Sequence, residues 1–260
     1  MLILLPPSEG KSAPASGPPV DLNSLTYPSL AESRRRVGDT LAKVSNQRNA
    51  LSALGVGPGL ADDVARNATV WSNPADSAAR VYSGVLYDAA GAARWDGASL
   101  MRAGESVRTI SALWGVVAPS DRIPAYRLSM STSLGRIGPL AAWWRPRLTP
   151  LLDAEADGGL IVDCRSAPYV AAYRPTASHW VTVTVEREVA GKRTVVSHTA
   201  KHTRGLLVGR LIASDLRPET AEDLADAAAE MIGDALVDVA LEVTGSHSSR
   251  LTLVTGGEGG

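Results

Sequence analysis

Several residue types that mark common classes of protein are rare or missing in this chain. Its 260 residues contain no phenylalanine and a single cysteine, Cys164. One cysteine excludes a disulfide within the chain, which fits a reducing compartment. Without phenylalanine, the core has to be filled mainly by leucine, valine, alanine and tryptophan.

Long apolar runs and the best-known catalytic motifs are absent as well. The apolar start Met1–Leu5 is too short for a signal peptide or a membrane span. We therefore expect a cytoplasmic protein with no membrane partner. There is no Walker A loop, GxGxxG fingerprint or GxSxG elbow. The four histidines lack the spacing of a metal site, so we expect no metal and no cofactor.

The composition that is present is that of a globular protein with an uneven charge distribution. Hydrophobic residues make up 45% and charged residues 20%, and the net charge is −1. Residues 215–242 hold nine acids and one base, which leaves about +7 on the remainder. This separation is compatible with an anion-binding face. Ordinary solvated surfaces are the alternative explanation.

The segment Ile110–Ser131 combines an apolar strand with a stiffened loop. After the apolar part comes a Pro-Ser-Asp turn, and Pro124 then keeps the residue before it extended. The loop ends in Tyr126 and Arg127. Binding and catalytic residues concentrate in loops that a rigid scaffold holds. The alternative is a core strand whose loop arginine pairs with a protein carboxylate.

A glycine-rich turn joins two short helical segments within residues 45–68. Its sequence Leu-Gly-Val-Gly-Pro-Gly-Leu-Ala resembles the hairpin of a helix-hairpin-helix motif, in which backbone N–H groups contact a DNA phosphate. The acids Asp62 and Asp63 follow directly and would repel phosphate. A plain helical hairpin is therefore the alternative. The candidate DNA-binding residues are Gly55, Gly57, Gly59 and Arg66.

Periodicity places strands and helices along the rest of the chain. In the helix expected at Ser29–Asn46, the arginines Arg34–Arg36 should lie mainly opposite the apolar face. Pro146 should kink or split a helix at Leu140–Leu152. Residues 215–260 should form an acidic helix, with Pro218 in its first turn, and a closing hairpin. Further strands are expected at Met1–Leu5, Gly159–Cys164, His179–Glu188 and Thr194–Thr199, and another helix from about Ala200.

Four cations follow the ends of strands or rigid loops, namely Lys11, Arg127, Lys201 and Arg204. Ligands of mixed α/β sheets bind where such ends converge. Lys201 and Arg204 share the first turn of a helix, where two positive charges oppose the helix dipole. We expect them to hold an anion, which is either a protein carboxylate or a ligand. We predict one basic anion-binding cleft formed by Ser8, Lys11, Tyr82, Tyr126, Arg127, Ser166, Tyr169, Lys201 and Arg204.

Nucleophilic chemistry has one candidate, the thiol of Cys164. It follows a predicted strand, and the neighbouring Arg165 would lower the pKa of a reactive thiol. We favour the alternative, a buried strand cysteine. No proton-transfer pair stands out, so the sequence predicts no catalytic residue.

Two stretches resemble signatures of the YaaA peroxide-stress family. Leu113–Met130 contains Trp-Gly, a Pro-x-Asp turn and Pro-Ala-Tyr-Arg-Leu-Ser-Met, in which Ala125 is an insertion relative to the family pattern. Ala200–Gly205 matches Ala-Lys-x-x-Arg-Gly. Weaker similarities are the Pro-Pro-Ser-x-Gly-Lys loop, the Tyr-x-Gly-x-x-Tyr pattern and a Ser-x-Glu-Tyr element. In that last element Pro168 replaces the acid, so no catalytic role of the acid can be transferred.

This resemblance implies a fold and a function. The fold would be α/β (α+β), a single domain over residues 1–260 with a mixed β-sheet flanked by helices. A helix-hairpin-helix-like insertion would lie near residues 50–68. The function would be a cytoplasmic response to peroxide stress, with sequence-independent binding of double-stranded DNA and limitation of damage from intracellular iron. The alternative is an enzyme that acts on a phosphorylated, nucleotide or carboxylated small molecule in the cleft.

Overall fold

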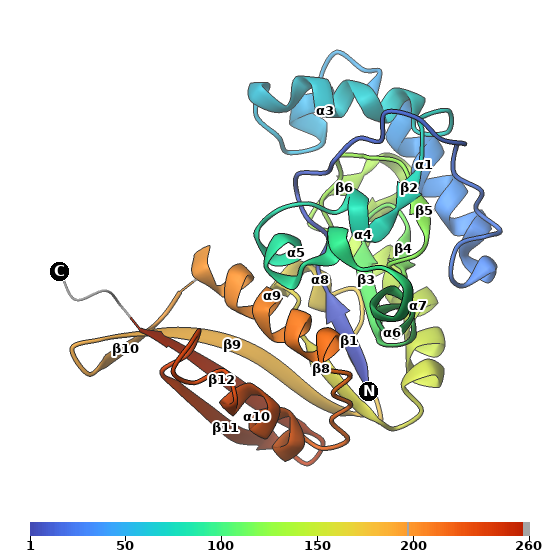
Figure 1. Ribbon diagram of the computed structural model, residues 1–260. Helices are drawn as coiled ribbons and strands as arrows, with labels where there is room; N and C mark the ends of the chain where they lie inside the picture. Colours follow the sequence, from blue (N-terminus) through green and yellow to red (C-terminus); the bar gives the residue numbers. More distant parts are fainter. Residues whose placement is uncertain (197, 257–260) are drawn as a thin grey trace.

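A mixed sheet runs through the centre of the molecule in the computed structural model, which describes residues 1–196 and 198–256 but not the side chain of His198 (Figure 1). Its 8 strands follow the order β11-β12-β9-β8-β1-β3-β4, and β10 pairs with β9. This mixed sheet with flanking helices confirms the predicted α/β class. The strands of this sheet are β1 (Leu2–Leu5), β3 (Val107–Ser111), β4 (Gly115–Val117), β8 (Leu160–Asp163), β9 (His179–Val189), β10 (Lys192–Val195), β11 (Asp238–Gly245) and β12 (Ser248–Gly256).

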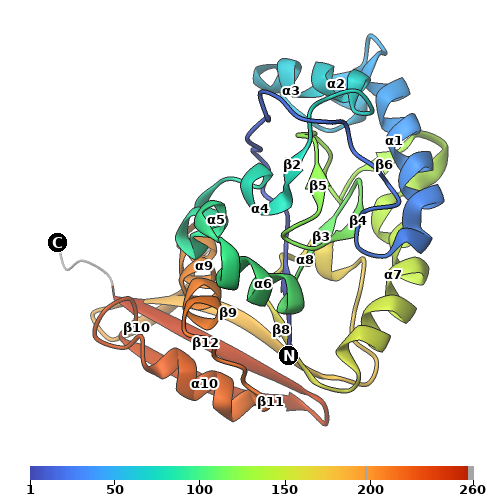
Figure 2. The same cartoon turned by 45° about the vertical axis from the view of Figure 1, so that its right-hand side comes forward.

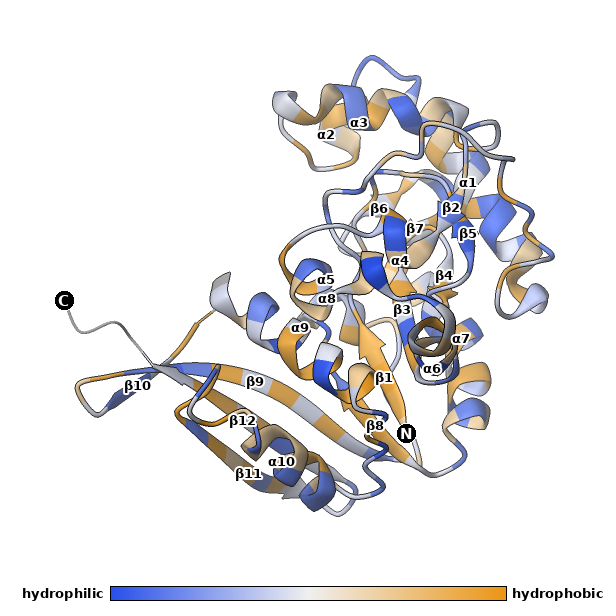
Figure 3. Cartoon of the chain, in the orientation of Figure 1, coloured by the Kyte–Doolittle hydropathy of each residue, from blue (hydrophilic) through white to orange (hydrophobic). Residues whose placement is uncertain are grey.

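The central strand β1 is hydrophobic along its whole length (Figure 3). It is parallel to β3 on one side and to β8 on the other, and all four of its residues are buried. Strands covered on both faces need such continuous apolar runs. Because the three strands are parallel, the segments that follow Leu5, Ser111 and Asp163 leave the sheet at the same edge.

Helices cover both faces of the sheet. In Figure 2, α5, α6 and α9 lie on one side of β1 and β8, and α7 lies on the other. No helix among residues 1–196 and 198–256 is long and apolar enough to cross a membrane. The α-helices are α1 (Ala31–Ser45), α2 (Ala50–Ala53), α3 (Ala61–Arg66), α4 (Ala78–Val81), α5 (Val85–Ala90), α6 (Gly97–Ser106), α7 (Leu140–Ala156), α8 (Ala167–Val170), α9 (His198–Ala213) and α10 (Ala221–Ala229).

Shorter elements complete the fold. Two small sheets pair β2 with β5 and β6 with β7. The segment predicted as a hairpin within residues 45–68 consists of α2, the glycine turn, the 3-10 helix η2 and α3, in that order. The strands are β2 (Asp76–Ser77), β5 (Arg122–Ile123), β6 (Ser133–Leu134) and β7 (Gly138–Pro139), and the 3-10 helices are η1 (Pro28–Leu30), η2 (Pro58–Leu60), η3 (Asn67–Thr69), η4 (Ala92–Arg94) and η5 (Gly135–Ile137).

Of the kink or split predicted for the Leu140–Leu152 helix, the split is wrong, and the kink stays a prediction. Helix α7 runs through both Pro146 and Pro150 without interruption. Each internal proline removes one helix hydrogen bond. Burial of the face that carries Trp144 and Leu148, spaced four residues apart, offsets that cost.

The acidic helix of the C-terminal part begins later than predicted. Pro218 lies before α10 instead of in its first turn, and Thr220 is the N-cap. The hydroxyl of Thr220 accepts a hydrogen bond from the backbone N–H of Asp223, and the Asp223 carboxylate accepts one from the Thr220 N–H. Such a capping box fixes the start of a helix. The closing hairpin is confirmed as β11 and β12, while residues 257–260 of the predicted region lie outside the described residues.

The expectation that Arg34 faces away from the core is wrong. Its side chain is fully buried. The guanidinium donates hydrogen bonds to the carbonyl oxygens of Trp114 at 2.9 Å and Val116 at 2.9 Å. It also donates to the carbonyls of Thr26 at 2.6 Å and Tyr27 at 3.2 Å. A buried cation is tolerated there because it satisfies backbone acceptors that would otherwise be unpaired.

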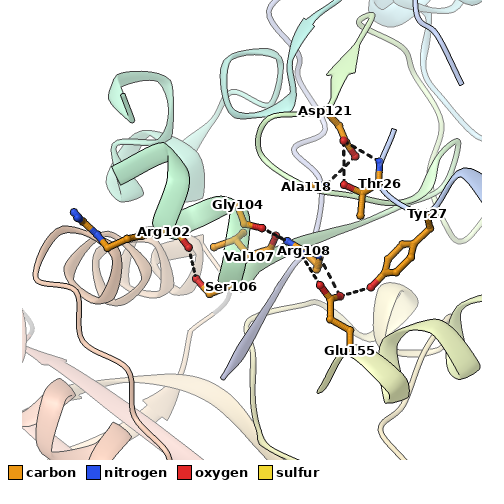
Figure 4. Close-up of polar contacts among 10 residues, drawn as sticks. All are labelled: Thr26, Tyr27, Arg102, Gly104, Ser106, Val107, Arg108, Ala118, Asp121 and Glu155. Carbon is orange, nitrogen blue, oxygen red and sulfur yellow. Dashed lines mark hydrogen bonds and ion pairs between the residues drawn. The ribbon is translucent and has the colours of Figure 1, made fainter. Parts of the chain in front are cut away.

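The turn aspartate of the Leu113–Met130 signature has a structural role. Asp121 accepts hydrogen bonds from the backbone N–H of Ala118 at 3.0 Å and from both the N–H and the hydroxyl of Thr26, at 2.9 and 3.0 Å (Figure 4). It thereby closes its own turn and fastens the N-terminal segment to it. Figure 4 also shows Arg108 of β3 paired with Glu155 of α7, which accepts a further hydrogen bond from Tyr27.

Two glycines of α9, Gly205 in the Ala200–Gly205 signature and Gly209 one helical turn later, let α9 pack closely on α5. A Cβ atom at Gly205 would lie 2.3 Å from the carbonyl oxygen of Leu86 and 2.8 Å from the Cβ of Ala89. One at Gly209 would lie 3.1 Å from the carbonyl oxygen of Ala90. The glycine of the signature is therefore required by helix packing, independently of any ligand.

We predict that Gly205→Ala destabilises the protein by about 1–3 kcal/mol, because the added methyl group clashes with the backbone of α5. The matched control is Gly104→Ala in α6, where no atom lies within 4 Å of the new Cβ. That substitution should stabilise the fold by about 0.4–1 kcal/mol. Urea unfolding of both variants measures the difference. Equal free energies of unfolding for the two variants would show that the α5–α9 contact is not tight.

Candidate anion-binding site

The loop after β1 is fixed to the segment between α4 and α5. Ser8 accepts a hydrogen bond on its hydroxyl from the backbone N–H of Ser83 at 3.1 Å. Lys11 forms an isolated β-bridge with Tyr82, and its ammonium donates to the carbonyl oxygen of Ser8 at 2.7 Å. The loop is therefore rigid at both ends, as expected for a site held by a scaffold.

Two tyrosines lie beneath the side chain of Lys11. The Lys11 Nζ is 4.2 Å from the ring centroid of Tyr126 and 5.6 Å from that of Tyr82. The two hydroxyl groups are 3.1 Å apart, and that of Tyr126 is 2.7 Å from the hydroxyl of Ser111. Both tyrosines are 2% exposed. They form the base under the cation, and their hydroxyls are already occupied.

Burial lowers the pKa of Lys11 from 10.5 to about 7. The positive charge of Arg127 acts in the same direction, and the charges of Glu9 and Asp63 act against it. A lysine with such a pKa is partly neutral at physiological pH. Asp63 belongs to α3, so this helix contributes to the electrostatics of the site.

Arg127 is held from two directions. Its guanidinium pairs with the carboxylate of Glu9 at 2.9 Å and donates to the Glu9 carbonyl at 3.1 Å. Its backbone N–H donates to the side-chain oxygen of Asn67 at 2.8 Å, and the Asn67 amide donates to the Arg127 carbonyl at 2.9 Å. The pairing of Arg127 with a protein carboxylate, given as an alternative from the sequence, is present.

A groove of about 460 Å³ separates the glycine turn from the Arg127 loop. One wall is formed by the turn residues Ser52–Val56, and the other by Arg127 and four hydroxyl residues that follow it. The lining is rich in hydrogen-bond donors, and Glu9 is its acid. Phosphate oxygens bind well to such donors. The hydroxyl residues are Ser129, Ser131, Thr132 and Ser133.

The four candidate hairpin residues differ in what they can offer. Gly55 adopts a φ of 67°, and its N–H donates to the carbonyl of Ser52, so it shapes the turn. Gly57 and Gly59 are exposed, and their N–H groups have no backbone acceptor in the part of the chain that the structure describes. Arg66 pairs with Asp63 at 2.7 Å, which largely cancels its charge.

Lys201 lines a different cavity from Arg127, and Glu9 borders both cavities. Lys201 is exposed and lines a second cavity of about 260 Å³ with the loop Pro6–Gly10 and the segment Ser83–Tyr87. Arg204 donates to the carbonyl oxygens of Val183 at 2.9 Å and Cys164 at 3.5 Å. Backbone carbonyls therefore hold this cation. No carboxylate of the described residues lies within 4 Å of it. A ligand role for Lys201 and Arg204 stays a prediction.

The remaining predicted cleft residues lie on the β8 side of the site. Ser166 is exposed and precedes α8. Tyr169 is partly buried, and burial raises the pKa of its hydroxyl. The charge of Glu9 raises that pKa further, and the charge of Arg127 lowers it. A direct contact of either residue with a ligand stays a prediction.

Cys164 is a buried structural residue, as favoured from the sequence. Its side chain is fully buried, and burial raises the pKa of the thiol to about 12. Arg165 does not activate it, because the guanidinium makes two hydrogen bonds to Asp163, at 2.8 and 2.7 Å. Among the residues that are described, no three His, Cys, Asp or Glu side chains lie together as a metal site would require.

Three contributors to the site were not predicted from the sequence: Glu9, Asn67 and the hydroxyl residues after Arg127. Asn67 lies three positions after the buried Val64, so it continues the apolar face of its helix. A polar residue at such a position is a signal of a buried hydrogen-bonding role. The series Ser129, Ser131, Thr132 and Ser133 was visible in the sequence, but nothing indicated that it faces the glycine turn.

We predict that Lys11 titrates near pH 7, which NMR observation of its Cε and Hε signals measures directly. Arg127→Gln should raise this pKa, because it removes a neighbouring positive charge. Glu9→Gln should lower it, because it removes a stabilising negative charge. A midpoint near the ordinary lysine value in all three proteins would contradict the buried environment described for this amine.

Comparisons with known proteins identify the family to which the chain is similar. The family model described as "Peroxide stress protein YaaA" matches residues 1–231. The chain is 40% identical over 230 residues to UPF0246 protein SCO2297 of Streptomyces coelicolor, which covers 87% of this chain and 88% of that protein. It is 37% identical over 259 residues to UPF0246 protein CE1889 of Corynebacterium efficiens, covering 98% of this chain and 100% of that protein. The chain therefore belongs to the YaaA family of peroxide stress proteins.

Proposed function

We propose that this peroxide-stress protein binds duplex DNA through its phosphate backbone, in the groove between the glycine turn and the Arg127 loop. It would act in the cytoplasm and limit the damage that intracellular iron causes to DNA. One observation carries the proposal: the glycine turn and Arg127, identified separately in the sequence, line the same groove.

The groove offers the donors that a phosphate requires. The exposed residues Gly57 and Gly59 follow the lining residue Val56 on the turn side, and Arg127, Ser131 and Ser133 line the opposite side. These contacts would address phosphate oxygens and not base edges, so they are independent of DNA sequence. A phosphate would replace the Glu9 carboxylate at Arg127.

The second candidate function is an enzyme that acts on a phosphorylated, nucleotide or carboxylated small molecule. Two observations favour it. The cavity beside Lys201 has a size suited to a small molecule, and its lining includes Ser8 and Ser83. In addition, Asp62 and Asp63 stand next to the glycine turn, where they oppose the approach of DNA.

Binding of a fluorescent duplex across a range of salt concentrations tests the first candidate. We expect the logarithm of the binding constant to fall linearly with the logarithm of the salt concentration. Arg127→Gln should reduce the steepness of this dependence by about 1, because one phosphate contact is lost. Glu9→Gln should strengthen binding, because it removes the competing carboxylate.

Arg250→Gln is the control for loss of one positive charge. Arg250 pairs with Glu242 on the exposed β11–β12 hairpin, away from the groove. This variant should bind DNA as the wild type does. If the wild-type protein binds no DNA at low salt, the proposal fails. Binding of a nucleotide or a sugar phosphate that is lost in Lys201→Glu would then favour the second candidate.

A further inference from the structure

We infer that the face formed by α1, α7 and the adjoining η5 is a second contact surface for the DNA backbone, built from Lys43, Arg136 and the pair Arg36 and Arg147 at Trp143. This inference rests on the proposed DNA binding and extends it beyond the groove. We call these five residues the α1–α7 face.

Two guanidinium groups share one tryptophan on this face. The guanidinium carbon of Arg147 is 3.6 Å from a ring centroid of Trp143, and that of Arg36 is 5.1 Å away. Arg147 also donates to the carbonyl oxygen of Trp143 at 2.6 Å and to the hydroxyl of Ser33 at 3.1 Å. Stacking and these bonds fix the Arg147 side chain before any ligand binds, which reduces the entropy lost on binding.

Half of the arginines of the chain form ion pairs, but these cations form none among the described residues. In the described part of the chain, no carboxylate lies within 4 Å of the charged groups of Arg36, Lys43, Arg136 or Arg147. Burial lowers the pKa of Arg147, and the positive charge of Arg36 acts in the same direction. The indole N–H of Trp143 is buried and has no acceptor among the described residues. An anion would relieve the repulsion between the cations and would accept their hydrogen bonds.

Few acidic residues lie near the α1–α7 face. Lys43 and Arg136 line a cavity of about 390 Å³ that also contains Asp39 and Thr40. The Asp39 carboxylate already accepts a hydrogen bond from the indole of Trp71 at 2.7 Å. Glu32, in the first turn of α1, is the other acid of that helix. The balance of charge on the face therefore stays positive.

The extent of the face favours a polymer over a single phosphate. Arg36 and Lys43 are seven residues apart on α1, which is about 10 Å along the helix axis. Successive phosphates of one DNA strand are only about 3.4 Å apart along the duplex axis, so one strand could contact both residues.

The face is also continuous with the groove of the proposed function. Ser133, which lines the groove, is followed within three residues by Arg136 of η5. The C-terminal end of α1 meets the glycine-turn segment, because Asn67 bonds the hydroxyl of Ser45 at 3.3 Å. In Figure 2, α1 and α7 lie along one side of the molecule and α2 and α3 lie at the upper end of that side. A duplex seated in the groove could therefore continue along α1.

Two double variants test this inference by the salt dependence of duplex binding. Lys43→Gln with Arg136→Gln changes two exposed side chains, and Arg36→Gln with Arg147→Gln changes the pair at Trp143. Each variant should reduce the steepness of the salt dependence by about 2, since each removes two phosphate contacts. Thermal unfolding verifies that each variant is folded, and the first variant leaves the packing of Trp143 intact.

Arg187→Gln with Lys192→Gln is the control. It removes two exposed charges from the β9–β10 hairpin, at the opposite end of the molecule from α1 (Figure 1), and should leave the salt dependence unchanged. The inference is overturned if both α1–α7 variants retain the wild-type steepness of the salt dependence while Arg127→Gln reduces it. In that case the proposed function still stands. Absence of any duplex binding by the wild type at low salt overturns both. If the α1–α7 variants lose binding to inorganic polyphosphate but bind duplex DNA as the wild type does, the inference is overturned as well.

Discussion

The two hydrogen bonds between the Asn67 amide and the backbone of Arg127 are the contact on which the candidate site depends. They join the segment after α3 to the loop after β5, which are 60 residues apart in the sequence. Asn67 is fully buried, so leaving its amide unpaired would cost about 1–3 kcal/mol. The same amide contacts Ser45 at the end of α1. The glycine turn, the arginine loop and α1 are thereby positioned by one side chain.

Electrostatic compensation keeps the cations of the site together without a ligand. Glu9 occupies Arg127, and burial beside Arg127 lowers the pKa of Lys11, which reduces the repulsion between the two. Arg204 is satisfied by backbone carbonyls. The four cations of the α1–α7 face have no such ion-pair partner among the described residues. Proteins retain uncompensated positive charge at low stability cost when it is exposed, and it then attracts polyanions.

The sequence predicted the elements better than the contacts between them. Apolar runs and alternation located β1, β8, β9 and the closing hairpin, because burial and pleating determine those patterns directly. The position of Arg34 on the apolar face of α1 was readable from its spacing to Leu30 and Val37, yet its charge suggested the opposite side. Only the fold shows which carbonyls it satisfies. The assignment of Lys201 and Arg127 to two cavities that both border Glu9 likewise depends on side-chain directions that no motif specifies.

The candidate site requires that the glycine turn and the Arg127 loop bind one anion together. An NMR titration with a short DNA duplex tests it most directly, through the backbone amides of Gly57 and Gly59 and the side-chain Nε of Arg127. All three signals should shift with the same dissociation constant, while the signal of the Gly191 amide in the β9–β10 turn should not move. Shifts confined to one side of the groove, or different dissociation constants on its two sides, would contradict it.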